Sequence, residues 1–205
     1  MWKWGKKVIY TFARHLVKII LSLFGRLKIH GKEKLPDQED GGYVVACTHT
    51  GWVDILWLGI AIFPVKIHYM AKIELFKNPL LKWLMGKLNA FPVDRENPGP
   101  SAIKVPRRLL KEGQVVGIFP SGTRTSEEVP LKRGAVTIAS HGKAPIVPAA
   151  YVGPNNFKDL FRRIKPRLIF GEPIYADENL PRREAMEKMM EELNQALNKL
   201  QKEIK

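Results

Sequence analysis

The sequence predicts a three-layer α/β domain with a mostly parallel central sheet flanked by helices. The first observation behind this prediction is that short apolar segments alternate with helical segments after residue 30. The second is the length of 205 residues, which suits one domain with a substantial core. No internal repeat or low-complexity tract interrupts the alternation. Buried strands that alternate with helices are typical of parallel sheets.

The expected elements follow the chain in order. Strands are expected at 43–47, 67–71, 89–93, 115–119, 145–150 and 167–174, with helices between them at 55–63, 79–87, 100–111 and 131–141. A last helix is expected from Pro181, because proline is favoured in the first helical turn. Its apolar stripe, which we expect to pack in the core, consists of Met186, Met190, Leu193, Leu197, Leu200 and Ile204.

Residues 1–29 are expected to form a basic, amphipathic segment that lies at a membrane interface, ahead of a domain at 30–205. No acidic residue precedes Glu33, and apolar and polar side chains separate onto two helical faces between residues 2 and 24. After Lys18 only residues 19–25 are uncharged, far fewer than the roughly 18 apolar residues of a spanning helix. The alternative is a helix that packs on its own domain.

The charge balance predicts an anionic partner. The chain has 34 Lys and Arg against 20 Asp and Glu, a formal charge of +14. The candidates are nucleic acid, a phospholipid surface, or an acidic protein or substrate, and no nucleic-acid-binding motif is present to favour the first. The single cysteine, Cys47, excludes an intrachain disulfide and offers no zinc cluster. We expect it to be a buried strand residue, with a nucleophile as the alternative.

The spacing of His49 and Asp54 indicates a reactive pair. Five residues separate them by roughly 140° on a helix and place them on opposite faces of a strand. The two side chains can meet only if the chain leaves a strand, turns at Gly51 and enters a helix. A carboxylate in that position would orient the imidazole and stabilise its charged form, as a general base requires.

A second group of residues suggests a phosphate site. The strand at 115–119 leads into Gly122, Thr123 and Arg124, which offer backbone amides, a hydroxyl and a guanidinium. Thr123 occupies the position of the P-loop lysine, so nucleotide hydrolysis is not expected. Arg95 follows the strand at 89–93 and offers another cation. Ser121 lacks the flanking pattern of a nucleophile elbow.

Four blocks in order resemble the glycerolipid acyltransferase family, specifically bacterial 1-acyl-sn-glycerol-3-phosphate acyltransferases of the PlsC type. These blocks are His49…Asp54, Phe91-Pro92-Val93-Asp94-Arg95, Phe119-Pro120-Ser121-Gly122-Thr123-Arg124 and Val147-Pro148-Ala149-Ala150. The segment 70–75 is also similar, with Lys72 as a further basic ligand. The resemblance covers residues 30–175. It departs at Ser121, where the family usually has Glu, and near Asn89, where it usually has Gly.

The resemblance implies transfer of an acyl chain from acyl-ACP or acyl-CoA to the sn-2 hydroxyl of 1-acyl-glycerol-3-phosphate, which gives phosphatidic acid. His49 would be the general base, oriented by Asp54, and Arg95, Gly122, Thr123, Arg124 and Lys72 would hold the phosphate. Backbone amides near Gly51 or Gly122 would stabilise the oxyanion. No metal or cofactor is implied beyond the acyl carrier protein or coenzyme A thioester.

The implied location is the cytoplasmic face of the cell membrane, with a peripheral or monotopic attachment to anionic phospholipid. Residues 80–85 either pack in the core or contact the membrane, and the basic segment 157–163 either contacts the membrane or docks an acidic carrier protein. Two alternatives to the transferase stay open. One is a serine-type lipid hydrolase that uses Ser121, and the other is a non-catalytic protein that binds anionic membranes.

Overall fold

The computed structural model describes residues 26–94, 97–120, 133–162 and 164–204. The strands are β1 (Lys28–His30), β2 (Val44–Cys47), β3 (Ile67–Lys72), β4 (Phe91–Val93), β5 (Val115–Ile118), β6 (Ile146–Val152) and β7 (Arg167–Phe170). The α-helices are α2 (Val53–Ala61), α3 (Pro79–Lys87), α4 (Ser101–Lys111), α5 (Gly134–Gly142), α6 (Phe157–Phe161) and α7 (Arg182–Glu203). Short 3-10 turns are η1 (Lys32–Lys34), η2 (Gln38–Asp40) and η3 (Ile73–Phe76).

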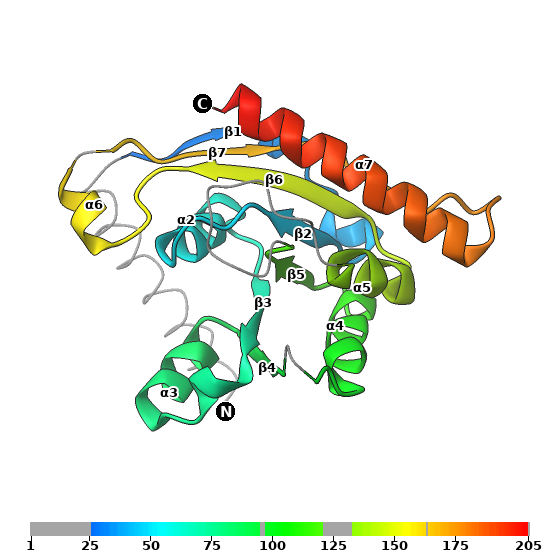
Figure 1. The fold of residues 1–205 in the computed structure, drawn as a ribbon, viewed down its shortest axis with the longest axis horizontal. Helices are drawn as coiled ribbons and strands as arrows, with labels where there is room; N and C mark the ends of the chain where they lie inside the picture. The colour runs from blue at the N-terminus through cyan, green and yellow to red at the C-terminus, as the bar shows by residue number, and fades with distance from the viewer. Residues whose placement is uncertain (1–25, 95–96, 121–132, 163, 205) are drawn as a thin grey trace.

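These strands form one mixed sheet in the order β1-β7-β6-β2-β5-β3-β4 (Figure 1). All neighbouring pairs are parallel except β6 and β7, which are antiparallel. The carboxyl ends of β6, β2, β5, β3 and β4 therefore share one edge of the sheet, where α/β folds place their ligands, and β1 and β7 run the opposite way. The predicted fold class, an α/β domain with a mostly parallel sheet, is confirmed.

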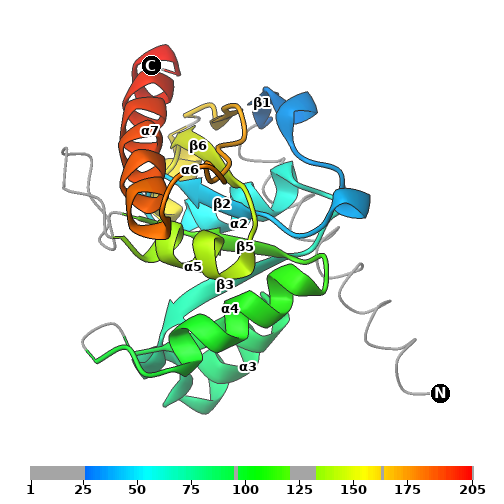
Figure 2. The ribbon, with the colours of Figure 1, turned by 90° about the vertical axis from the view of Figure 1, so that its right-hand side faces the viewer.

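Helices cover both faces of the sheet (Figures 1 and 2). Val45 and Cys47 of β2 point to one face, where their core cluster includes Trp57 of α2 and Leu160 of α6. Val44 points to the other face, where the core includes residues of α4, α5 and α7. This alternation is the period of two that a strand buried on both sides requires.

Several expected boundaries differ from the structure for local reasons. The expected strand at 89–93 begins only at Phe91, because Asn89 takes a left-handed conformation with φ 53° after α3. The expected strand at 167–174 ends at Phe170, and Ile174 keeps only an isolated bridge to Ile146. The helix expected at 131–141 is described from Gly134, since 131 and 132 lie outside the described residues.

The last helix differs from expectation only in its first turns. It begins at Arg182 rather than at Pro181, and its buried stripe runs through Ala185, Met189 and Leu193. Met186 and Met190, which we expected in the core, are only partly buried. Because a helix turns 100° per residue, these two methionines, each one position after Ala185 and Met189, lie on the flank of the stripe. The other expected members, Leu193, Leu197, Leu200 and Ile204, are buried as predicted.

Two short elements, β1 and α6, were not expected from the sequence. β1 pairs with β7, so the sheet begins two residues before the domain boundary predicted at 30. The membrane role of residues 1–29 stays a prediction, because 1–25 lie outside the described residues. Among the helices the structure describes, none is both long and apolar enough to cross a bilayer.

Candidate active site

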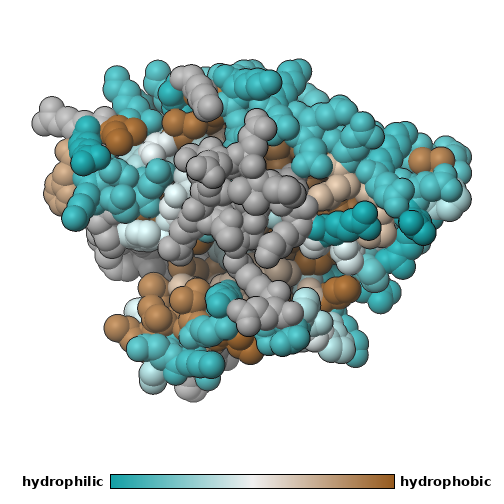
Figure 3. Space-filling model, in the orientation of Figure 1, coloured by the Kyte–Doolittle hydropathy of each residue, from teal (hydrophilic) through white to brown (hydrophobic). Residues whose placement is uncertain are grey.

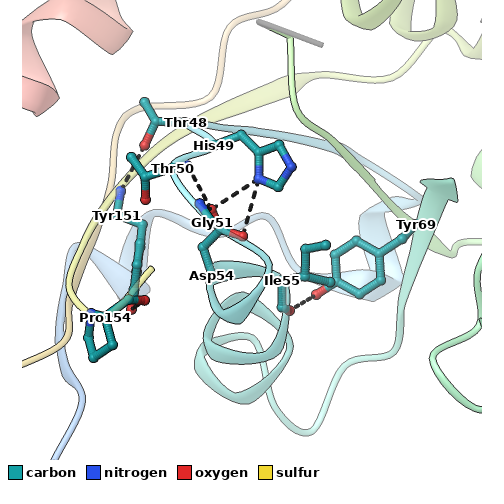
Figure 4. Close-up of polar contacts among 9 residues, drawn as sticks. All are labelled: Thr48, His49, Thr50, Gly51, Asp54, Ile55, Tyr69, Tyr151 and Pro154. Atoms are coloured by element: carbon teal, nitrogen blue, oxygen red, sulfur yellow. Dashed lines mark hydrogen bonds and ion pairs between the residues drawn. The ribbon is translucent and has the colours of Figure 1, made fainter. Parts of the chain in front are cut away.

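The predicted meeting of His49 and Asp54 occurs at the turn that joins β2 to α2 (Figure 4). β2 ends at Cys47, and α2 begins at Val53, so Asp54 lies in the first helical turn. A carboxylate is favoured there because the helix N-terminus carries partial positive charge. The chain reverses between the two elements and brings the side chains together. The predicted contact is confirmed.

His49 binds Asp54 through Nδ1, which lies 3.0 Å from Oδ2 and 3.2 Å from Oδ1. The backbone amides of Thr50 and Gly51 donate to the same Oδ2, at 2.8 and 3.0 Å. Asp54 is 0% exposed and His49 is 8% exposed. Because an ionised carboxylate only accepts hydrogen bonds, Nδ1 carries the proton and Nε2 is the ring nitrogen left to accept one.

An aromatic stack supports the imidazole from its face. The ring of Phe119, which directly follows β5, lies 4.3 Å from the His49 ring at an interplanar angle of 29°. Phe119 in turn stacks on Tyr69 of β3 at 6.3 Å, and the Tyr69 hydroxyl donates to the carbonyl of Ile55 at 2.7 Å. This stack, together with the Asp54 contact, fixes the plane of the imidazole. The sequence identifies Phe119 only as part of a motif and does not predict this stacking.

The segment after β6 contacts the turn between β2 and α2. The Trp52 amide donates to the carbonyl of Asn155 at 3.3 Å. A Cβ at Gly51 would collide with the backbone of Asn155, so only glycine allows this approach. Thr48 accepts from the Tyr151 amide at 3.0 Å. Sequence reasoning did not predict these contacts, which join residues about a hundred positions apart.

These contacts engage three of the amides near Gly51, a group that the sequence offers as candidates for stabilising an oxyanion. The amides of Thr50 and Gly51 instead donate to Asp54, and that of Trp52 donates to Asn155. These three amides therefore hold the Asp54 carboxylate and the turn in place. The other candidate, the amide near Gly122, lies outside the described residues.

Cys47 is a buried strand residue, as expected, and is 0% exposed. Burial raises the pKa of its thiol well above the usual value, and the negative charge of Asp54 raises it further, while a hydrogen bond with Thr48 lowers it. The thiolate is therefore scarce near neutral pH, and the thiol is a poor nucleophile.

The predicted phosphate ligands are only partly within the described residues. Lys72 ends β3 at the same edge of the sheet as His49, and its ammonium lies 3.4 Å from the carboxylate of Glu74. Arg95, Gly122, Thr123 and Arg124 lie outside the described residues, as does Ser121. Their roles remain predictions. Among the described residues no group of three His, Cys, Asp or Glu side chains could hold a metal ion.

A cavity of about 340 Å³ opens beside the aromatic stack. It lies between the carboxyl ends of β4 and β5 and the helices α4 and α5. Its lining includes Met70, Ala102, Ile103, Phe119 and Ile138 and is mainly apolar. Phe119 therefore separates an apolar chamber from the imidazole, because it both lines the cavity and stacks on His49.

The chain belongs to the acyltransferase family, whose sequence model matches residues 26–152. It is 56% identical to the 1-acyl-sn-glycerol-3-phosphate acyltransferase of Bacillus subtilis, over 96% of this chain and 98% of that protein. The Streptococcus pneumoniae enzyme of the same name is 39% identical, over 83% of this chain and 64% of that protein.

A solved structure supports the same fold. The crystal structure of PlsC, the 1-acyl-sn-glycerophosphate acyltransferase of Thermotoga maritima, superposes with a TM-score of 0.69. The match covers 97% of this chain and 82% of that one at 21% identity.

Proposed function

We propose that this protein transfers an acyl chain from a thioester to the sn-2 hydroxyl of 1-acyl-glycerol-3-phosphate, which gives phosphatidic acid. The names of its curated relatives support this acceptor. The observation that carries the chemistry is the buried His49–Asp54 pair, with Nδ1 engaged by the carboxylate. A pair built in this way is suited to act as a general base.

The reaction is a direct displacement. Nε2 of His49 accepts the proton of the acceptor hydroxyl as its oxygen attacks the thioester carbonyl. The tetrahedral intermediate then breaks its carbon–sulfur bond, and the departing thiolate takes the proton from the imidazolium. Asp54 stabilises that imidazolium between the two steps. No acyl-enzyme is needed, in keeping with a buried Cys47 whose thiol pKa is raised.

Substrate binding divides between a polar and an apolar part. Arg95, Thr123, Arg124, Gly122 and Lys72 hold the acceptor phosphate, which places the hydroxyl at a fixed distance from that anchor. The apolar cavity beside Phe119 receives a hydrocarbon chain, since its lining offers methyl, thioether and ring surface. The acyl donor is a carrier-protein or coenzyme A thioester. The enzyme works as a peripheral protein on the cytoplasmic face of an anionic membrane.

A thiol-release assay tests this function. The purified full chain is mixed with a long-chain acyl thioester of coenzyme A or of acyl carrier protein. The acceptors compared are lysophosphatidate, lysophosphatidylcholine and glycerol 3-phosphate. We expect rapid release of thiol only with lysophosphatidate. Equal rates with lysophosphatidylcholine would contradict recognition of a terminal phosphate, and thiol release without any acceptor would indicate a hydrolase.

A further inference from the structure

An exposed apolar surface covers η3 and α3, at the far side of the molecule from α7 (Figures 1 and 3). In α3, which the structure describes in full, no residue is buried. Leu80, Trp83 and Leu84 are 71%, 61% and 41% exposed, and their spacing of three and four puts them on one helical face. Ile73 of η3 is also exposed. Contiguous apolar surface of this kind marks an interaction site, unlike a single exposed leucine.

This surface is bordered by positive charge. Lys77, Lys82 and Lys87 lie in or beside α3, and the sequence has no acidic residue between positions 75 and 93. The Lys87 ammonium lies 5.5 Å from the centre of the Trp83 ring. Exposed leucines beside a tryptophan and several lysines are typical of helices that lie in an anionic lipid interface. An acidic protein would also match the lysines, and the experiments below distinguish it from a membrane.

The position of the surface relates it to the site. α3 and η3 follow β3, and His49 follows β2, while β5 lies between these strands and is parallel to both. Both features therefore lie at the carboxyl edge of the sheet. A lipid acceptor that keeps its chain in the bilayer must approach His49 from this edge.

Hydrogen bonds at the start of α3 stabilise the helix that carries this surface. The Asn78 side chain caps α3 by accepting from the amides of Leu80 and Leu81 at 2.9 and 3.2 Å, and Pro79 occupies the first turn. These contacts stabilise the first turn of α3, and its apolar face is turned outward.

We propose that the η3–α3 surface inserts into an anionic membrane interface and turns the carboxyl edge of the sheet toward the lipid. This inference rests on the proposed function, because it takes the acceptor to be a membrane lipid. It adds a contact within the folded domain to the one predicted for residues 1–29. Leu80 and Trp83 enter the headgroup region, and the lysines bind lipid phosphates.

The first test measures binding of the full chain to vesicles of phosphatidylcholine and phosphatidylglycerol. Leu80→Gln with Trp83→Gln keeps helix propensity while removing the apolar contact. We expect binding to weaken roughly tenfold or more, because each buried side chain of this size contributes appreciably. Tyr175→Gln is the matched control, since Tyr175 is 63% exposed outside this surface. Unchanged binding in the double variant would overturn the proposal.

The second test places a fluorophore at the surface. Cys47 is buried, so Leu80→Cys can be labelled selectively with a polarity-sensitive dye. We expect a blue shift when anionic vesicles are added, and no shift for a label at Lys199→Cys on α7. A label at position 80 that stays in a polar environment while the protein is bound to vesicles would refute insertion.

Activity separates this inference from the proposed function. With a short-chain, monomeric lysophosphatidate we expect the double variant to match the wild type, and with vesicle-embedded acceptor we expect it to be slower. A wild type that releases no thiol with either acceptor would refute the proposed function. A variant that binds vesicles normally but no longer accepts acyl carrier protein would assign the surface to that protein and overturn the membrane role.

Discussion

Replacement of Asp54 by Asn changes one atom of the buried pair and keeps its shape. The amide oxygen must take the position of Oδ2, because Thr50 and Gly51 both donate there at 2.8 and 3.0 Å. The amide nitrogen then lies at the position of Oδ1, 3.2 Å from Nδ1 of His49. A donor now lies beside Nδ1 in place of an acceptor, although the amide oxygen stays 3.0 Å from Nδ1, and the charge that stabilised the imidazolium is gone. Both changes weaken Nε2 as a base.

The size of the effect follows from these contacts. Loss of general-base catalysis lowers kcat by about 10²–10⁴-fold. The two backbone hydrogen bonds survive, so Asp54→Asn should leave the fold largely intact. Asp54→Ala differs, because it leaves the Thr50 and Gly51 amides without an acceptor, which costs about 1–3 kcal/mol for each buried group. The Asn variant should thus lose activity at nearly normal stability, and the Ala variant should lose both.

Thiol release under saturating acceptor measures kcat, and thermal unfolding measures stability. We expect Asp54→Asn to lower kcat by at least a hundredfold, with little change in KM for lysophosphatidate. A variant that keeps more than a third of wild-type kcat would refute the role assigned to the carboxylate. A large loss of stability in the Asn variant would show that the charge itself holds the turn together.

Three further predictions concern the surroundings of the site. Gly51→Ala forces a Cβ against the backbone of Asn155 and should cost about 1–3 kcal/mol in unfolding experiments, whereas Gly86→Ala, with open space around it, should not destabilise. Ala102→Phe should fill the apolar cavity and exclude the end of a long acyl chain. Each methylene of the chain that loses its place there costs about 0.8 kcal/mol, so rates with long acyl chains should fall roughly tenfold relative to chains two carbons shorter. Burial raises the pKa of the Cys47 thiol, so the folded state keeps a proton that the unfolded chain loses above about pH 8.5. The free energy of unfolding should therefore be constant below that pH and decrease above it, with the unfolding constant rising by up to tenfold per pH unit. Urea titrations at several pH values should show a smaller decrease for Cys47→Ala.

The centre of the site could be predicted because its geometry is local. His49 and Asp54 are five residues apart, and only a strand that turns into a helix can bring them together. The supporting contacts depend on strand order instead. Phe119 reaches His49 because β5 pairs with β2, and Asn155 reaches Trp52 because β6 does. No local pattern encodes those neighbours.

The exposed face of α3 shows a different limit of sequence reasoning. From the sequence, Leu80 and Trp83 could be core residues or membrane contacts, because an apolar stripe does not indicate what it packs against. The structure leaves both exposed. In the last helix, the sequence alone does not show which methionine is buried. Methionines at 186, 189 and 190 all fit an apolar stripe, and only Met189 is buried in the structure.

The most direct test of the account compares the wild type with His49→Ala for phosphatidic acid formed from an acyl thioester and lysophosphatidate, detected by mass spectrometry. Vesicle binding is measured in parallel to show that both proteins reach the lipid. We expect phosphatidic acid from the wild type and about 10²–10⁴-fold less from the variant at equal vesicle binding. Phosphatidic acid formed at the same rate by both proteins would contradict it.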